Sequence, residues 1–279
     1  MSTTAYNPES EGAKMQFADA MSYGDYLHLD QLLSQQCPLS NTHDEPLFII
    51  QHQTSELWMK LILHELGAAR ELLKQGELPQ MFKMLARVSR IFEQLNNQWD
   101  VLRTMTPADY TQFRQALGVS SGFQSYQYRM IEYILGNRNP SMLKPHAHVP
   151  NVQQMLQAEL ERPSFYQEVV RYLFKALDGN LDQLPTESYD TPTAPSPEIQ
   201  ARWRIVYENI DQYWDLYNLG EKLVDLEDYF RRWRFNHVTT VERVIGFKRG
   251  TGGTSGVKYL RRMLEVELFP DLWHLREHL

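Results

Sequence analysis

The sequence predicts an all-α protein in which helices pack on one another. Apolar residues recur three and four positions apart along most of the 279 residues, and this spacing marks one face of a helix. Ser, Thr or Asp near proline or an acidic residue repeatedly marks a helix start, and glycine repeatedly marks an end. No segment alternates apolar and polar residues as a half-buried strand does. We therefore expect a single helical domain over residues 21–279, preceded by a polar, mobile segment over residues 1–20.

Composition excludes several classes of protein. The formal net charge is −7, from 28 basic and 35 acidic residues, and no basic tract is interleaved with aromatic residues, so nucleic acid is not an expected partner. Apolar runs stay short of the roughly 18 residues that read as a membrane span, and the N-terminus lacks the apolar core of a signal peptide. The single cysteine, Cys37, excludes an intrachain disulfide and fits a reducing compartment. We expect a cytoplasmic protein without a membrane partner.

The first two expected helices differ greatly in length. Residues 23–33 carry an aromatic and apolar face but are too few to form a core, so this helix must dock on the body of the protein or on a neighbouring subunit. Asp44 as N-cap and Gly76 as stop bound a long second helix. Within it, Phe48 and His52 lie four residues apart and share a face. Taken alone, such a histidine is more often a core or surface residue than a ligand.

Five more helices are expected before residue 178. They cover residues 78–105, 107–117, 121–135, 151–161 and 163–177.

The second of these five helices has a strong start signal in Thr106 and Asp109, and Gly118 ends it. It places Tyr110 and Arg114 four residues apart on one face. An arginine in this setting is usually a solvated surface residue. If its guanidinium faces a pocket instead, it would hold a carboxylate through two hydrogen bonds.

The segment over residues 137–150 lacks helical periodicity and holds His146 and His148. Two histidines so close together raise the alternative of a site that binds a metal ion directly. No acidic residue lies near them in the sequence, so this signal is weak.

The C-terminal part begins with a long connection over residues 178–197, which contains four prolines. The longest expected helix follows, starts at Pro197 or Glu198 after Ser196 as cap, and runs towards Ile245, with Gly220 as the place where it bends. One last helix is expected over residues 257–279, broken before Pro270.

Residues 232–256 join a helical segment to a glycine-rich, basic and hydroxyl-rich loop, and His237 lies in the helical part. A histidine next to a loop with accessible backbone N–H groups suits a site that holds a cofactor together with a small polar ligand. The alternative is a buried core histidine followed by an ordinary helix end. The glycine spacing is not that of a phosphate-binding loop, and no strand pattern precedes it.

Four stretches carry a resemblance to a known family. They are YGDYLHLDQLL at 23–33, FIIQHQTSELWMK at 48–60, DYTQFRQALGVSSGFQSYQYR at 109–129 and FNHVTTVERVIGFKRGTGGTSG at 235–256. Together and in this order they closely resemble the tryptophan 2,3-dioxygenase family, over a region that runs from about Tyr23 to Pro270.

The resemblance implies an all-helical bundle that encloses a haem, in a cytosolic homotetramer. The cofactor implied is one haem b per subunit, ferrous in the active form. The implied reaction cleaves the indole C2–C3 bond of L-tryptophan with O₂ and gives N-formyl-L-kynurenine, the first step of the kynurenine pathway. Two alternatives are a haem-binding sensor or carrier without turnover, and a helical scaffold that binds no haem.

The resemblance assigns His237 as the protein ligand of the haem iron and Ser121 as a residue against the haem edge. A neutral imidazole on ferrous iron leaves the opposite position open for O₂. His52 matches the histidine that accepts a hydrogen bond from the indole N–H and so orients the substrate. We expect orientation and polarity from His52 rather than an obligatory base, because an indole N–H is very weakly acidic. Phe48 is expected to pack against the indole ring.

The remaining assignments also rest on the resemblance. Arg114, with Tyr110 beside it, matches the residue that holds the substrate carboxylate, and Thr251 matches the one that contacts the carboxylate and ammonium groups. Gly250 and Gly252 would let the loop approach and close over the ligand.

The resemblance gives the short first helix a role as well. Tyr23, Tyr26 and Leu27 match positions that line the pocket from an adjacent subunit, so the active site would depend on oligomerisation.

Overall fold

The structure is a computed structural model that describes residues 5–177, 181, 184 and 191–279. The described residues form helices, turns and loops without any strand, so the expected all-α class is confirmed. Contacts divide the chain into two units, Met1–Pro38 and Leu39–Leu279. The single domain from residue 21 and the mobility of the first 20 residues stay predictions.

The unit Met1–Pro38 contains a 3₁₀ helix, η1 (Pro8–Glu11), and two short helices, α1 (Tyr23–Leu27) and α2 (Leu29–Leu32). The expectation of one helix over residues 23–33 is wrong, because His28 adopts a left-handed conformation with φ of 51° and separates the two pieces. None of the residues in these three elements is buried.

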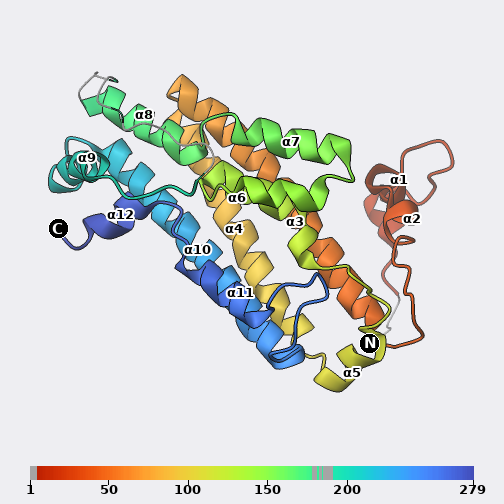
Figure 1. Ribbon diagram of the computed structural model, residues 1–279. Helices are drawn as coiled ribbons and strands as arrows, with labels where there is room; N and C mark the ends of the chain where they lie inside the picture. The colour runs from red at the N-terminus through yellow and green to blue at the C-terminus, as the bar shows by residue number, and fades with distance from the viewer. Residues whose placement is uncertain (1–4, 178–180, 182–183, 185–190) are drawn as a thin grey trace. The chain divides into compact units, whose positions relative to one another are not determined.

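Three long helices form the centre of the second unit: α3 (Glu45–Gln75), α4 (Leu78–Leu102) and α10 (Trp214–Val244). The central helix α4 packs along both α3 and α10, as Figure 1 shows. Each presents an apolar stripe to the shared core, where aliphatic and aromatic side chains are fully buried. Burial of each large apolar side chain stabilises the packing by about 1.5–3 kcal/mol.

Shorter helices complete this unit, and their bounds follow. They are α5 (Pro107–Phe113), η2 (Gly122–Gln124), α6 (Tyr126–Leu135), η3 (Pro140–His146), α7 (Pro150–Leu160), α8 (Phe165–Leu177), α9 (Pro197–Glu208), α11 (Val257–Arg262), η4 (Met263–Glu265) and α12 (Pro270–Leu275).

Most of the expected caps occur where the sequence places them. Gly76 ends α3 in a left-handed conformation, and Thr106 forms a capping box with Asp109 at the start of α5. Asp44 stands at the N-cap of α3, but its side chain makes no capping hydrogen bond. The helix expected from residue 121 begins later, because Ser121 caps the 3₁₀ helix η2 and Ser125 then caps α6.

The expectation of one helix from Pro197 or Glu198 to Ile245 is wrong. Helix α9 ends at Glu208 and α10 begins at Trp214, and the Asn209 side chain donates to the carbonyl of Ile205 at the break. Helix α10 continues through Gly220, and a bend there stays a prediction. A Cβ on Gly220 would lie 3.1 Å from the Tyr207 hydroxyl, so the glycine lets the aromatic side chains of α9 pack closely on α10.

Two further expectations need correction. The segment over residues 137–150 contains η3, and the single helix expected over residues 257–279 is three short pieces, α11, η4 and α12. The break before Pro270 is confirmed. The buried carboxylate of Glu227 accepts from the N–H groups of Leu268 and Phe269 there, at 2.8 and 2.9 Å. Most of the proline-rich connection over 178–197 lies outside the described residues.

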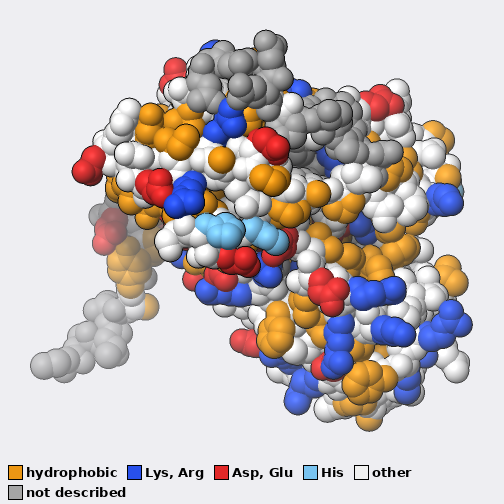
Figure 2. All heavy atoms as spheres, turned by 60° about the vertical axis from the view of Figure 1, so that its left-hand side comes forward, with side chains coloured by type: hydrophobic (Ala, Val, Ile, Leu, Met, Phe, Trp, Pro, Cys, Tyr) orange, Lys and Arg blue, Asp and Glu red, His pale blue; other side chains and the backbone are white. Residues whose placement is uncertain are grey.

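The surface carries charges of both signs. Figure 2 shows Lys and Arg interspersed with Asp and Glu over the displayed face. Among the described residues, no helix is both long enough and apolar enough to span a bilayer.

Candidate functional site

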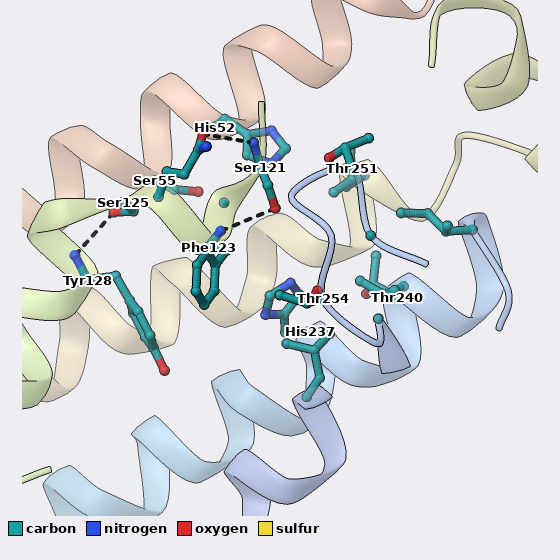
Figure 3. Close-up of a pocket in the computed structure, with 18 of the residues that line it drawn as sticks. His52, Ser55, Ser121, Phe123, Ser125, Tyr128, His237, Thr240, Thr251 and Thr254 are labelled. Atoms are coloured by element: carbon teal, nitrogen blue, oxygen red, sulfur yellow. Dashed lines mark hydrogen bonds between the residues drawn. The ribbon is translucent and has the colours of Figure 1, made fainter. Parts of the chain in front are cut away.

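A cavity of about 530 Å³ lies in the second unit, bounded by α3, α4 and α10 and by the segments 117–129 and 249–263. Figure 3 shows side chains from α3, from α10 and from both segments around it. A volume of this size is typical of sites for cofactors and small molecules. Its apolar lining includes Phe48, Met59, Trp99, Leu102, Met105, Leu117, Val241, Val244, Ile245 and Leu260.

His237 lies on the α10 wall of the cavity, and two tryptophans fix its ring. The imidazole stacks on the indole of Trp99, with centroids 5.0 Å apart, and contacts Trp233 at 5.5 Å. Its ring nitrogens have no hydrogen-bond partner among the described residues. Burial, with a smaller contribution from His52, lowers the pKa of His237 to about 4. The imidazole is therefore neutral at physiological pH, and its free lone pair suits a metal ligand.

His52 projects from α3 into the same cavity. Its Nδ1 lies 2.7 Å from the carbonyl oxygen of Phe48. Because a carbonyl only accepts, Nδ1 carries the proton and Nε2 is a hydrogen-bond acceptor. Burial lowers the pKa of His52, although the carbonyl of Phe48 and the charge of Glu56 oppose the shift, and so the ring stays neutral. The Phe48 ring packs on it at 4.1 Å.

These residues fit a flat, largely apolar, metal-containing macrocycle such as haem. Most of the lining is apolar, and one neutral histidine without a protein partner faces the space. Among the described residues, no three His, Cys, Asp or Glu side chains come together to hold a metal ion on their own. The alternative metal site at His146 and His148 therefore lacks a third protein ligand among the described residues. His146 is buried, with an unpaired Nε2.

Tyr110 and Arg114 meet as their spacing predicts, but only Tyr110 lines the cavity. Arg114 donates to the Tyr110 hydroxyl and, at 2.7 Å, to the carbonyl of Arg249 in the glycine loop. Its buried Nε has no partner. Burial raises the pKa of Tyr110, so its hydroxyl stays protonated. Arg114 thus links α5 to the loop and keeps unused donor capacity.

The glycine loop over residues 249–256 lies against the segment that holds Ser121. Gly250, Thr251 and Ser121 all line the cavity, and the Thr251 hydroxyl donates to the carbonyl of Ser120 at 2.5 Å. A Cβ on Gly252 would lie 2.8 Å from the Cβ of Ser121, so only glycine permits this close approach. Contacts with Ser120 and Ser121 therefore hold the loop against one side of the cavity.

Tyr23, Tyr26 and Leu27 belong to the other unit. Their exposed fractions are 75%, 71% and 39%, which is high for apolar side chains. The structure contains one subunit, so their expected place in a neighbouring pocket stays a prediction.

Several residues of the site were missed by sequence reasoning. Trp99 stacks on His237, and Tyr128, Arg129 and Arg234 line the cavity. The pairing of Arg129 with Glu132, three residues later inside an apolar helix, was the available signal. Trp99 had none, because its contact partner is more than 100 residues away in the chain.

Fold and site together define an all-helical protein that binds a ligand between its helices, with neutral histidines on two walls of that site. Comparison with known proteins narrows this class. A family model for tryptophan 2,3-dioxygenase matches residues 8–184 and 199–279. The chain is 75% identical over 276 residues to the tryptophan 2,3-dioxygenase of Ruegeria sp. (strain TM1040), covering 99% of each chain.

Two other relatives agree. The chain is 67% identical over 273 residues to the tryptophan 2,3-dioxygenase of Ruegeria pomeroyi, covering 98% of each. It is 62% identical over 277 residues to that of Bradyrhizobium diazoefficiens, covering 99% of each. This chain belongs to the tryptophan 2,3-dioxygenase family.

Proposed function

We propose that this chain is a haem-dependent, cytoplasmic dioxygenase that cleaves the indole C2–C3 bond of L-tryptophan with O₂. The product is N-formyl-L-kynurenine, which opens tryptophan degradation by the kynurenine pathway. The observation that carries the proposal is the pair of neutral imidazoles, His52 and His237, on an apolar cavity in a chain of this family.

His237 is the proposed iron ligand of one haem b per subunit, ferrous in the active form. Three features support this: its low pKa, its lack of a protein hydrogen-bond partner, and the stacking on Trp99 that fixes its ring. Haem, when bound, supplies the iron centre that activates O₂. Ser121, on the cavity lining, is the residue proposed to lie against the edge of the cofactor.

His52 is proposed to orient the indole. Because Nδ1 donates to the carbonyl of Phe48, Nε2 offers a lone pair to the indole N–H of the substrate. A neutral imidazole is too weak a base to remove that proton readily, so the role is positioning. Phe48, 4.1 Å from His52, provides an apolar surface for the indole ring.

Arg114, Tyr110 and Thr251 are proposed to hold the amino-acid end of tryptophan. The Arg114 guanidinium donates to the carbonyl of Arg249 and to the Tyr110 hydroxyl, and it retains other N–H groups, Nε among them, for a carboxylate. Thr251 lies in the same loop, so a bound carboxylate would couple substrate binding to loop position. Gly250 lets the backbone come close, and the closed loop excludes water from the reacting atoms.

A homotetramer is the proposed assembly. Helices α1 and α2 bury no residue of their own and expose Tyr23, Tyr26 and Leu27. Contact with a neighbouring subunit would cover this apolar surface and complete the neighbour's pocket.

The test is an absorption experiment on the purified, reduced protein. We expect a haem band and, after addition of L-tryptophan in air, growth of N-formylkynurenine in the near ultraviolet. A haem band without product, in a tetramer that binds tryptophan, would favour a sensor or carrier. Absence of a haem band after haem is supplied would contradict the proposal.

A further inference from the structure

Two buried arginines line the cavity outside the residues used above. Arg129 on α6 and Arg234 on α10 are 4% and 3% exposed, and both contact the cavity together with Tyr128. Arg234 lies three residues before His237, which is about one helical turn. We refer to Arg129 and Arg234 as the arginine pair.

The arginine pair has a single carboxylate partner. Glu132 is fully buried, is ion-paired with Arg129, and lies 3.1 Å from Arg234. Within the described ranges no other carboxylate forms an ion pair with either guanidinium. Two positive charges therefore share one negative charge.

Besides Glu132, the arginine pair faces Tyr128, His146 and Tyr259, whose hydroxyl hydrogen-bonds Arg129. Tyr128 and His146 add no negative charge. Burial raises the pKa of Tyr128, so its hydroxyl is neutral and accepts from Arg234 at 3.4 Å. Burial, with help from Arg129, lowers the pKa of His146, which is neutral as well. Asn137 donates its amide to Glu132 at 2.9 Å. One positive charge is left uncompensated at a buried site beside the cavity, which is unfavourable until an anion arrives.

Arg129 also retains unused donor capacity, because its buried Nε has no hydrogen-bond partner. The excess charge, the orphan donor and the contact with the cavity all indicate an anionic group on whatever fills the cavity. The guanidinium is the side chain best suited to a planar carboxylate.

We propose that the arginine pair binds a carboxylate of the cofactor, a propionate of haem. This inference rests on the proposed function, because it takes haem as the occupant. A macrocycle ligated by His237 carries its carboxylates at the rim, and Arg234 lies one turn along the same helix. The carboxylate of the substrate is the other group that could bind here, but the proposed function assigns it to Arg114.

The test compares haem with haem dimethyl ester, in which both propionate carboxylates are esterified. Apoprotein is titrated with haem and with haem dimethyl ester, in the same detergent, and dissociation rates are measured by transfer to apomyoglobin. A charge-assisted hydrogen bond makes the natural protein bind haem about 10- to 100-fold more tightly than the ester. In Arg129→Met the preference falls to about threefold or less, because the remaining Arg234 is neutralised by Glu132.

A second variant changes the preference in the opposite direction. Glu132→Gln removes the competing carboxylate, and so its preference for haem over the ester rises above that of the natural protein. A merely structural role predicts no such increase. Circular dichroism and gel filtration of each apoprotein establish that the variants fold.

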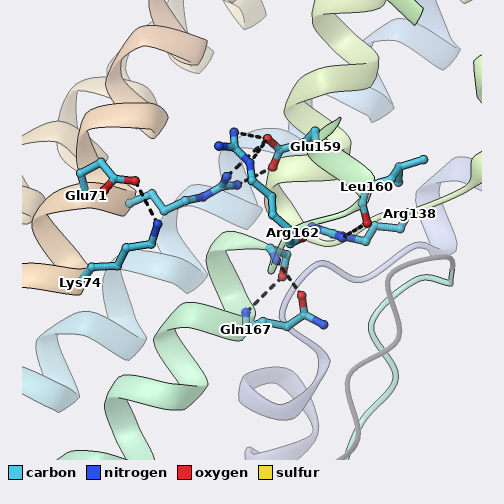
Figure 4. A network of polar contacts seen from close by, with 9 residues as sticks. Glu71, Lys74, Arg138, Glu159, Leu160, Arg162 and Gln167 are labelled. Carbon is cyan, nitrogen blue, oxygen red and sulfur yellow. Dashed lines mark hydrogen bonds and ion pairs between the residues drawn. The ribbon is translucent and has the colours of Figure 1, made fainter. Parts of the chain in front are cut away.

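Arg70→Met is the matched control. Arg70 is as buried as the arginine pair, but it is bound to Glu159 in a separate network outside the cavity lining, around the Glu159 and Arg162 shown in Figure 4. The Arg70→Met variant is expected to prefer haem over the ester by the same factor as the natural protein. An equal fall in Arg70→Met would overturn the inference.

The remaining outcomes are equally decisive. If the natural protein binds haem and the ester equally well, the inference is overturned although haem binding stands. The inference is also overturned if Arg129→Met prefers haem over the ester as strongly as the natural protein does. If Arg129→Met keeps its preference but binds L-tryptophan more weakly, the carboxylate is that of the substrate. If the natural apoprotein binds neither porphyrin, the haem assignment itself fails, and this inference fails with it.

Discussion

The imidazole of His237 lies nearly parallel to the indole of Trp99, with ring centroids 5.0 Å apart and 14° between the planes. Trp233 contacts the same imidazole from another direction, at 5.5 Å. The ring orientation is thus set by packing between α4 and α10. Such preorganisation by neighbouring side chains is what a metal ligand requires.

Replacement of His237 by Ala should cost the protein its haem, because no other described residue is assigned to the iron. The ratio of Soret to protein absorbance after gel filtration measures retention. His146→Ala is the control, since it removes another buried histidine outside the cavity lining and should leave loading unchanged. A fully loaded His237→Ala variant with normal turnover would remove His237 as the ligand.

Replacement of His52 by Ala should slow turnover without abolishing it. The variant loses one neutral hydrogen bond to the indole N–H, worth about 0.5–1.5 kcal/mol, or roughly a 2- to 12-fold lower kcat/KM. Steady-state kinetics with L-tryptophan provide the measurement. Complete loss of activity, with haem and substrate still bound, would indicate an essential base instead of a positioning residue.

The pH dependence follows from the same histidine. Burial lowers the pKa of His52 below 6.5, so the neutral, accepting form persists as the pH falls through 6.5. We therefore expect kcat/KM to hold constant from pH 8 through 6.5 and to fall only at lower pH. An acidic limb centred at or above pH 6.5 that disappears in His52→Ala would show that the ring protonates like a solvent-exposed histidine.

Arg114→Lys should weaken tryptophan binding, because a lysine cannot present two parallel donors to a carboxylate. The loss of a charge-assisted hydrogen bond corresponds to about 1.5–3 kcal/mol, or roughly a 10- to 150-fold lower kcat/KM. Arg204→Lys, in an exposed ion pair with Glu208, is the control and should behave as the natural protein. Unchanged kcat/KM in Arg114→Lys would refute the carboxylate role.

The network around Glu159 makes a prediction about stability. Glu159 accepts from Arg70 at 2.6 Å and from Arg162, and its exposed fraction is 1% (Figure 4). Glu159→Gln leaves the buried Arg70 charge unpaired, which should destabilise the fold by about 3–5 kcal/mol in urea unfolding.

Glu71→Gln is the matched control for this stability test. It breaks an exposed ion pair with Lys74 and should cost about 0–1 kcal/mol. Equal losses in Glu159→Gln and Glu71→Gln would contradict the buried-network argument.

Local signals were sufficient for much of the fold. The bounds of α3 and the capping box at Thr106 followed from single cap residues, because capping depends on the nearest three or four residues. The meeting of Phe48 with His52, and of Tyr110 with Arg114, followed from helical spacing alone. The roles of these residues came from the family resemblance.

Features that depend on distant contacts were not predictable. The break between α9 and α10 contains neither proline nor glycine. It lets the aromatic side chains of α9 pack against α10 at Gly220. The position of Trp99 against His237 depends on how α4 and α10 meet, which no local pattern records. Arg114 was expected to face the substrate, and its contact with the carbonyl of Arg249 depends on the conformation of a loop more than 130 residues away.

Turnover under ¹⁸O₂ tests the central claim most directly. Reduced enzyme and L-tryptophan are mixed in ¹⁸O₂-saturated buffer, and the product is analysed at once by mass spectrometry. The account predicts N-formylkynurenine that carries two ¹⁸O atoms, with none from the solvent in the initial product. A product with one labelled oxygen, or no product from a haem-loaded protein that binds tryptophan, would contradict the assignment as a dioxygenase.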